Sequence, residues 1–404
     1  MTSWLGRTLE AEVGAVAHGG HCVSRVDGRV VFVRHALPGE LVLAEVTEDK
    51  GGSYCRADAV RVLRAAPQRV TPPCPLAAPG KCGGCDWQHA APEFQRELKA
   101  RVVSEQLSRL AGIDRTVVVE ELPGGMLGWR TRMRLVVGRD GRAGMRAHRS
   151  HDVVPLPDSP PGGAGPCPIA RAGMLDSVVS RRWQPGAELE VTADADGNTH
   201  VRELSTVRGK RRARHIRGGV CVEHAAGRTW KLDAHGFWQV HPAAAEALAS
   251  VAGQWADAPR GGRAWDLYAG AGLFAAVLAG QVGPDGEVWA VESGRRASAD
   301  GAANLPDLPQ VRWHSGRVEQ VVRQLPEPAV VVLDPPRAGA GRAVVESIAD
   351  AGPARVVYVA CDPAALARDV ATFAGRGYEL SGLRAFDAFP MTHHVECVAL
   401  LARS

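Results

Sequence analysis

Residues 264–274 read AWDLYAGAGLF, and this stretch decides the fold of the C-terminal part of the chain. An apolar run leads to Asp266 and Tyr268, and Gly270 and Gly272 follow just before a segment rich in alanine and leucine. This order is typical of a β-strand that turns sharply into a helix, because glycine lets a ligand approach the backbone of the turn. NAD-dependent enzymes share this signal, so the turn predicts a nucleotide site without identifying the ligand.

Three further apolar strands are predicted downstream, and each ends at a reactive or charged side chain. They are residues 287–291 before Glu292, residues 329–333 before Asp334-Pro335-Pro336-Arg337, and residues 356–360 before Cys361-Asp362-Pro363. In a doubly wound sheet, ligands bind outside the carboxyl ends of the parallel strands. We therefore expect Asp266, Glu292, Asp334 and Cys361 to share one edge, and residues 382–389 and 395–401 to close the sheet as an antiparallel hairpin.

Cys361 is the strongest single candidate for a catalytic residue in the sequence. Asp362 and Pro363 before AALARDV are typical of a helix N-cap and its first-turn proline. The dipole of this helix would stabilise a thiolate, whereas the charge of Asp362 would oppose it unless the carboxylate turns away to cap the helix. A buried structural thiol is the alternative, and the nearby Asp334-Pro335-Pro336 motif favours a nucleophile.

The nine cysteines are unevenly distributed, and their odd number argues against a disulfide framework. Cys74, Cys82 and Cys85 lie within CPLAAPGKCGGC, a spacing typical of a metal or iron–sulfur loop, and Cys167 in a Pro/Gly-rich segment is the best fourth ligand. Unliganded structural thiols are the alternative. The remaining cysteines in apolar, strand-like surroundings are expected to be buried: Cys22, Cys55, Cys221 and Cys397.

A length of 404 residues and a mass of 42.8 kDa predict two or three folded units. Residues 1–64 alternate short β-like runs with turns, as in a small oligonucleotide-binding barrel, although a barrel without a ligand has the same pattern. Residues 65–235 form a predicted central α+β domain. Its helix spans about residues 92–110, where Phe94, Leu98 and Val102 recur every four residues. Residues 236–404 form the predicted α/β domain.

The net charge of +4 for the whole chain does not indicate any class of binding partner. One basic stretch at residues 207–217 is either an RNA contact or a solvated face: Arg208, Lys210, Arg211, Arg212, Arg214 and Arg217. The first residues lack the pattern of a signal peptide, and no run approaches the ~18 apolar residues that span a bilayer. We expect a soluble, cytoplasmic monomer without a membrane partner.

Four motifs in this order carry a specific resemblance: DLYAGAGLF, VVVLDPPRAG, YVACDPAALARDV and FPMTHHVE. Together with CPLAAPGKCGGCDWQH, they resemble the RNA uridine-C5 methyltransferases that act on tRNA and ribosomal RNA. Residues 5–64, with VVFVRHALPGE, resemble the RNA-binding TRAM domain of the ribosomal members. The resemblance covers nearly the whole chain and implies a TRAM barrel, a central iron–sulfur domain and a Rossmann-like domain that binds S-adenosylmethionine (SAM).

The resemblance also implies a role for individual residues. Cys361 is the nucleophile and Glu396 the general base, with His393 and His394 as rival bases. Four residues match positions of the SAM site: Gln239, Tyr268, Glu292 and Asp334. Four cysteines match the ligands of a [4Fe–4S] cluster: Cys74, Cys82, Cys85 and Cys167. The chain departs from the family where Asp362 replaces a more usual asparagine, where seven residues separate Cys74 from Cys82, and at Leu273.

The implied activity is methyl transfer from SAM to C5 of an RNA uridine through a covalent adduct between the cysteine and C6 of uracil, with ribosomal RNA expected rather than tRNA. Three alternatives stay open at this point. They are a methyltransferase with another acceptor, a cluster-containing RNA-binding protein, and a radical-SAM methylthiotransferase, whose C-x3-C-x2-C motif differs from the C-x7-C-x2-C found here.

Overall fold

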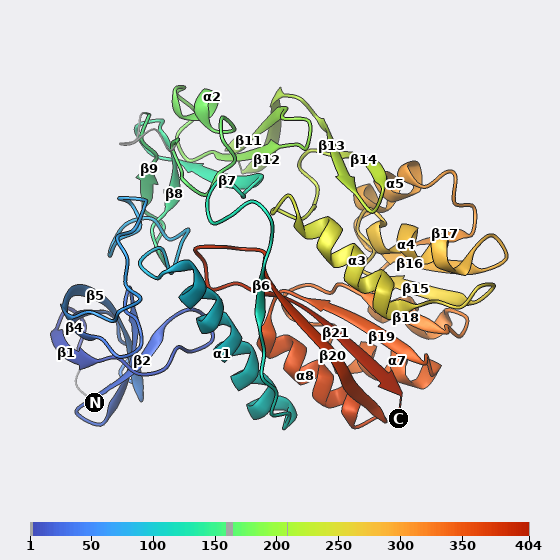
Figure 1. Ribbon diagram of the computed structural model, residues 1–404. Coiled ribbons are helices and arrows are strands. Elements are labelled where there is room, and N and C mark those ends of the chain that lie inside the picture. Colours follow the sequence, from blue (N-terminus) through green and yellow to red (C-terminus); the bar gives the residue numbers. More distant parts are fainter. Residues whose placement is uncertain (1–2, 159–164, 208, 404) are drawn as a thin grey trace.

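The computed structural model describes residues 3–158, 165–207 and 209–403 (Figure 1). Within these residues the strands form four sheets. A barrel-like sheet comes first, an antiparallel sheet and a separate hairpin follow, and a large mixed sheet with helices on both faces completes the chain. No helix of the described ranges has the length and apolar character that a membrane crossing requires.

The first sheet confirms the strand-rich, barrel-like N-terminal part. Its order is β1-β4-β5-β3-β2, and only the β3–β5 pair is parallel. The strands are β1 (Thr8–Glu12), β2 (Cys22–Val26), β3 (Arg29–Arg34), β4 (Leu41–Glu48) and β5 (Tyr54–Arg64). Alternate residues point inward, as expected of strands with one buried face, so that Val31, Val33, Val42 and Ala44 are fully buried.

The large sheet confirms the predicted Rossmann-like part. Its order is β17-β16-β15-β18-β19-β21-β20-β6; the central strands are parallel and β21 is antiparallel to both of its neighbours. The strands are β6 (Val119–Glu121), β15 (Arg263–Leu267), β16 (Glu287–Glu292), β17 (Val311–Ser315), β18 (Val330–Leu333), β19 (Arg355–Ala360), β20 (Tyr378–Asp387) and β21 (Glu396–Arg403). The hairpin β20–β21 is the one expected from the sequence.

Helices cover both faces of this sheet because alternate strand residues point to opposite sides. Ala264, Val288 and Val332 belong to the core on one face, whereas Trp265, Val291 and Val331 belong to the core on the other. The helices are α3 (Ala244–Ala256), α4 (Leu273–Val282), α5 (Arg295–Asn304), α6 (Val318–Val321), α7 (Arg342–Ala351) and α8 (Pro363–Ala374), with a short 3-10 turn at Val322–Gln324. The arrangement is the doubly wound architecture that AWDLYAGAGLF predicts.

Helix α1 (Pro92–Ala111) confirms the predicted helix to within one residue and joins the barrel to the large sheet. It begins at a proline in the first turn and ends at Gly112, whose φ of 67° suits a left-handed C-cap. Phe94 and Leu98 pack into the barrel core, whereas Val103 and Leu107 pack into the core of the large sheet. Figure 1 shows α1 between these two parts.

Lys99 on α1 forms a buried ion pair with Asp387 at the end of β20. Its Nζ lies 2.5 Å from Oδ1 of Asp387 and donates to the carbonyl of Phe389 at 3.0 Å. The Lys99 and Asp387 side chains are 0% and 1% exposed. Removing one partner would leave the other charge buried without compensation.

We therefore expect Lys99→Ala to lower the free energy of unfolding by about 3–5 kcal/mol. Arg101→Ala is the matched control, because Arg101 pairs with Glu97 on the exposed face of the same helix and should change stability by less than about 0.5 kcal/mol. Urea denaturation of both variants measures the difference. Equal, small losses in the two variants would contradict this role of Lys99.

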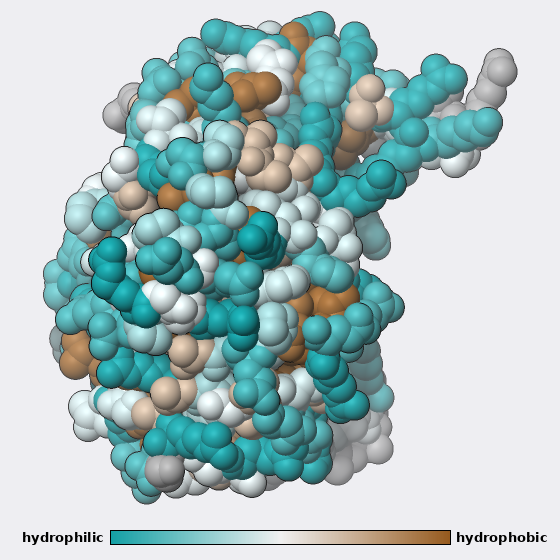
Figure 2. Space-filling model, turned by 90° about the vertical axis from the view of Figure 1, so that its right-hand side faces the viewer, coloured by the Kyte–Doolittle hydropathy of each residue, from teal (hydrophilic) through white to brown (hydrophobic). Residues whose placement is uncertain are grey.

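The central antiparallel sheet has the order β12-β11-β10-β7-β8-β9 and carries the short helix α2 (Asp176–Val179). Its strands are β7 (Arg132–Val137), β8 (Ala143–Arg146), β9 (Val153–Pro155), β10 (Glu188–Ala193), β11 (Thr199–Val207) and β12 (Lys210–Arg217). Figure 2 shows a narrow hydrophilic arm projecting from the upper part of the molecule, where Figure 1 places the β11–β12 hairpin. The separate hairpin consists of β13 (Val220–Ala225) and β14 (Arg228–Asp233).

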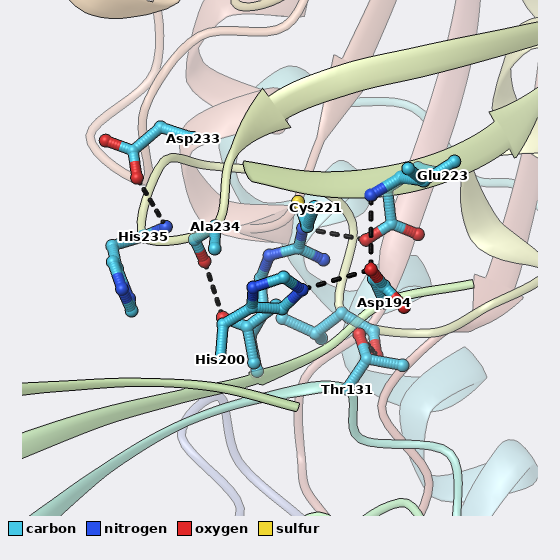
Figure 3. Close-up of polar contacts among 12 residues, drawn as sticks. Thr131, Asp194, His200, Cys221, Glu223, Asp233, Ala234 and His235 are labelled. Atoms are coloured by element: carbon cyan, nitrogen blue, oxygen red, sulfur yellow. Dashed lines mark hydrogen bonds and ion pairs between the residues drawn. The ribbon is translucent and has the colours of Figure 1, made fainter. Parts of the chain in front are cut away.

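A buried polar cluster fixes this separate hairpin to the central sheet (Figure 3). His200 Nε2 lies 3.0 Å from Oδ2 of Asp194, and the same oxygen accepts the N–H of Val222 at 3.3 Å. The Nδ1 atom of His200 accepts the N–H of Gly219. Since both ring nitrogens and the carboxylate have partners, the cluster is a structural junction between β10–β11 and β13.

The predicted boundaries at residues 64/65 and 235/236 stay a prediction. Both α1 and β6 come from residues 65–235 and pack on or extend the large sheet, and Trp230 of β14 belongs to the core that includes α3 and α4. The predicted central segment therefore supports the C-terminal part as well as forming its own sheet.

Candidate active site

The carboxyl ends of β18 and β19 bring Asp334 and Cys361 to one edge of the large sheet. The antiparallel strand β21 begins at the same edge, because Ala360 at the end of β19 lies opposite Cys397 near the start of β21. Glu396, one residue earlier, therefore begins β21 beside the end of β19. Three residues from separate motifs thus meet, as expected for the edge of a doubly wound sheet.

The surroundings of Cys361 favour the neutral thiol. Burial raises the pKa of Cys361 to about 12, and the carboxylates of Glu396, Asp334 and Asp362 act in the same direction, whereas Arg337 opposes them. The sequence left this pKa open, because the N-terminus of α8 favours the thiolate whereas the charge of Asp362 opposes it. Burial is the largest influence on this pKa, and the three carboxylates add to it.

Asp362 confirms the predicted helix cap. Its Oδ1 accepts the N–H of Ala365 at 2.8 Å, and Pro363 occupies the first turn of α8. Its Oδ2 lies 3.0 Å from Nε2 of His18, which comes from the barrel. The carboxylate has therefore turned away from the thiol toward the helix and the barrel.

Glu396 and Asp334 form a coupled acidic pair. Glu396 is 3% exposed, and burial together with Asp334 raises its pKa well above the usual range, with Arg337 acting in the opposite direction. Burial also raises the pKa of Asp334. A carboxyl group with a raised pKa is suited to take up a proton near neutral pH.

The Gly-rich turn lies next along the same edge. Glu292 at the end of β16 accepts the N–H groups of Gly270 at 2.9 Å and Gly294 at 2.5 Å, so its carboxylate is fixed against the turn. Tyr268 has a φ of +64°, a backbone conformation that is strained for a bulky residue and that clusters at functional sites. Its buried hydroxyl has no hydrogen-bond partner among the described residues.

Asp266 and Gly272 shape the floor of this turn. The Asp266 carboxylate accepts the N–H of Ala275 at 2.7 Å, and burial raises the pKa of Asp266 to about 8. A Cβ on Gly272 would lie 3.0 Å from the ring of Trp313, so only glycine fits here, at a φ of +90°. Gln239 is half-buried in the loop between β14 and α3, and among the described residues no hydrogen bond joins it to the turn.

A cavity of about 190 Å³ opens at Cys361. Arg337, His393 and His394 line it together with residues that the sequence analysis did not select, which are His18, Gly19 and Gly20 of the barrel and Val102 of α1. No sequence signal could have found these residues, because the barrel and α1 reach the pocket only through tertiary packing.

The surroundings of the two rival bases differ. His393 Nδ1 lies 2.6 Å from Oδ2 of Asp86. Burial, together with His393 and Arg337, lowers the pKa of His394 to about 3, so this ring is neutral. Both rings line the pocket, whereas Glu396 lies close enough to Cys361 to raise the pKa of the thiol, and Asp334 raises the pKa of Glu396 itself.

The four predicted cluster ligands line a second cavity. Cys74, Cys82, Cys85 and Cys167 surround it, together with Gln88 and Arg130, and none of these cysteines is in a disulfide. Across the described ranges, no group of three or more His, Cys, Asp or Glu side chains is arranged to hold a metal ion. The iron–sulfur centre is therefore not shown by the structure, although the four thiols do converge on one space.

The other cysteine and charge predictions have clear outcomes. The cysteines predicted to be buried are buried: Cys22, Cys55, Cys221 and Cys397. The basic stretch forms the exposed edge strand β12, where Arg214 pairs with Glu203 and Arg211 with Glu188. Arg208 lies outside the described residues. Exposed cations also protect edge strands from aggregation. Strand β12 is therefore consistent with an RNA contact and equally with a solvated face.

Comparisons with known proteins match both ends of the chain. A family model described as tRNA (uracil-5-)-methyltransferase matches residues 313–404, and a model of the TRAM domain matches residues 3–60. A curated relative from Streptomyces avermitilis, named an uncharacterized RNA methyltransferase, is 46% identical over 98% of this chain and 98% of its own. A relative of the same name from Gloeobacter violaceus is 31% identical over 99% of this chain and 97% of its own.

One solved structure matches over the whole fold. It is the crystal structure of Pyrococcus abyssi tRNA (uracil-54, C5)-methyltransferase in complex with S-adenosyl-L-homocysteine. The match has a TM-score of 0.72 and covers 98% of this chain and 100% of the other, at 20% sequence identity. At this identity the likeness shows that the two chains share their fold.

Proposed function

Because the chain belongs to the tRNA (uracil-5-)-methyltransferase family of RNA methyltransferases, we propose that it transfers a methyl group from SAM to C5 of a uridine in RNA. One observation carries the proposal. Cys361, Asp334 and Glu396 come from three separate motifs and influence one another at a single sheet edge, where Cys361 lines an open cavity. A nucleophile and a base are the two groups that this reaction needs from the protein.

The first step is attack on the pyrimidine ring. C5 of uracil is a weak nucleophile, and addition of the Cys361 thiolate to C6 turns the ring into an enolate whose electron pair is available at C5. The thiol must lose its proton to solvent through the open cavity before attack, and Arg337 favours the thiolate at this position. SAM would supply an electrophilic methyl group on a positively charged sulfur: the electron pair at C5 would form the new C–C bond as the S–CH3 bond breaks, and the sulfur would leave as the neutral thioether of S-adenosyl-L-homocysteine.

The second step is release of the product. After methylation, C5 still carries its hydrogen, and the Glu396 carboxylate removes it as a proton. The electron pair of the C5–H bond then forms the C5–C6 double bond, and the C6–S bond breaks to return the Cys361 thiolate. A raised pKa of Glu396 suits this task, because a weakly basic carboxylate would take the proton poorly.

We assign the SAM site to the turn beside this pocket. Glu292 would bind the ribose hydroxyls as a hydrogen-bond acceptor, and the unpartnered hydroxyl of Tyr268 would contact the cofactor. Asp334 lies between the turn and Cys361, where it could hold SAM or orient Glu396. Gln239 is kept as a contact on the ground of the family resemblance.

The RNA is expected to be ribosomal RNA rather than tRNA on the ground of the sequence resemblance of residues 5–64 alone. The TRAM domain match itself does not separate the two RNAs, because the structure of a tRNA (uracil-54, C5)-methyltransferase matches over 98% of this chain. An RNA uridine must be flipped from its stack to reach the Cys361 pocket, at a cost of a few kcal/mol unless it lies in a loop. The barrel would contribute backbone and stacking contacts that offset this cost. Mapping of 5-methyluridine in ribosomal and transfer RNA from a deletion strain identifies the substrate.

The direct test uses the purified protein, labelled SAM and unmodified RNA, followed by nucleoside analysis. We expect label in 5-methyluridine. Label in 5-methylcytidine or another nucleoside would overturn the assignment in favour of a different acceptor. Binding of RNA without any transfer of label would support the alternative of a cluster-containing RNA-binding protein.

We further propose that the four-cysteine cavity holds a [4Fe–4S] cluster that stabilises the central segment. Anaerobic reconstitution should yield about four iron atoms per chain, and Cys85→Ser should abolish this binding. Cys55→Ser is the matched control, because Cys55 is equally buried but lies in the barrel. Iron content measured by chemical analysis decides the matter, and retention of iron by Cys85→Ser would refute the site.

A further inference from the structure

The barrel forms one wall of the Cys361 pocket. Its turn at Gly19 and Gly20 lines the cavity, and the carbonyl of Gly20 accepts the indole N–H of Trp87 at 3.0 Å. A Cβ on Gly20 would lie 2.7 Å from the Cβ of His393, so the turn packs tightly against the loop that precedes Glu396. A segment of the barrel therefore packs directly against the loop that carries His393 and leads to Glu396.

His18 extends this contact to the residue beside the nucleophile. Its Nε2 lies 3.0 Å from Oδ2 of Asp362, the N-cap of α8, and the two side chains are 39% and 26% exposed. The charged groups that influence His18 are Asp362 and Arg368 of the α8 region and Glu105 of α1. His18 is thus the barrel's direct partner for the carboxylate next to Cys361.

We propose that His18 is a positioning residue for the chemistry at Cys361 and acts through Asp362, a role that rests on the proposed function of Cys361 as the nucleophile. The imidazole holds the carboxylate turned toward the barrel, and its positive charge offsets the negative charge beside the sulfur. An aspartate paired with a protonated histidine is close to neutral.

The charges around the pair give the role a definite pH dependence. The hydrogen bond to Asp362 raises the pKa of His18, so the ring keeps its charge to a higher pH than a free histidine. As the pH rises through this pKa, the charge is lost and Asp362 remains as an uncompensated carboxylate. Asp362 acts on Cys361 together with Glu396 and Asp334, against Arg337, and raises the pKa of the thiol. The contribution of His18 is therefore present at low and neutral pH and disappears at alkaline pH.

The test is the rate at which iodoacetamide alkylates Cys361, measured by mass spectrometry of the peptide spanning residues 356–368. Only the thiolate reacts, so the rate follows the thiol pKa. The full-length protein is used without RNA or SAM, so the readout does not depend on methyl transfer. Four variants are compared with the parent: His18→Ala, Asp362→Asn, the double variant, and His224→Ala as a matched control, because His224 forms a similarly exposed pair with Asp196 far from the pocket.

We expect His18→Ala to slow alkylation by up to about tenfold, the effect of one pKa unit, while His18 is protonated in the parent, with the difference closing as the pH rises through the raised pKa of His18. Asp362→Asn, which keeps a good helix cap, and the double variant should react at least as fast as the parent. His224→Ala should match the parent at every pH. Because the pair is partly exposed, high salt should also shrink the effect of His18→Ala.

Two results would overturn the proposal. One is a parental rate in His18→Ala across the pH range. The other is a double variant that stays as slow as His18→Ala, which would mean that His18 acts on the fold of the pocket rather than through the Asp362 charge. Failure of the proposed function would be seen separately, as absence of 5-methyluridine in the transfer assay even if the alkylation rates follow this pattern.

Discussion

Replacing Cys361 with alanine is expected to abolish methyl transfer to RNA, with a loss of at least about four orders of magnitude in turnover. Without the sulfur, C5 of uracil is never activated, because no other group at the pocket adds to C6. Removal of a covalent nucleophile leaves only the contribution of substrate binding and orientation.

Transfer of label from SAM to RNA measures this loss. Cys55→Ala is the matched control, since Cys55 is a buried cysteine of the barrel, and it should keep near-parental turnover once stability is accounted for. Retention of more than about a tenth of the activity in Cys361→Ala would rule out covalent catalysis through this residue.

Glu396→Gln is expected to separate methylation from release. The variant keeps the size of the side chain but loses the base, so methylated RNA should remain bonded to Cys361 and turnover should fall by about 10²–10⁴-fold. Denaturing gel electrophoresis with natural RNA and SAM shows the accumulated complex. His394→Ala is the control, because His394 lines the same pocket without the coupling to Asp334.

The pH dependence of the release rate gives an independent test of this prediction. Burial and Asp334 raise the pKa of Glu396, so its ionised fraction, and with it the rate of release, should increase as the pH rises through this raised pKa. The residual release in Glu396→Gln should lack this dependence. Accumulation of the complex in His394→Ala but not in Glu396→Gln would reassign the base to the histidine.

Much of the fold could be predicted from local patterns. Phe94, Leu98 and Val102 recur at helical spacing, and their helix ends within one residue of the predicted position. Glycine-rich turns and apolar runs predicted β15, β16, β18 and β19, because a buried strand has a continuous apolar sequence. The parallel edge strand β17 was not predicted, since its sequence VRWHS has no such run. The three-residue strand β6 has no such signal, since pairing with β20 alone defines it.

The site could be predicted only in part. Cys361, Asp334 and Glu396 follow recognisable strand ends or motifs, whereas His18 and Gly20 are separated from them by more than 300 residues of sequence. Their place in the pocket depends on how the barrel packs against α1. The direction of the Cys361 pKa could not be predicted either, because the combined effect of burial and three carboxylates depends on distances that a sequence does not contain.

The most direct test uses an RNA transcript in which 5-fluorouridine replaces uridine, incubated with SAM and the parent protein. Fluorine at C5 cannot leave as a proton, so the methylated adduct cannot resolve. We predict a complex that survives denaturation and a modified nucleotide on Cys361 within the peptide spanning residues 356–368. Absence of any such complex, or a complex that forms equally well in Cys361→Ala, would contradict the assignment of this sulfur as the nucleophile.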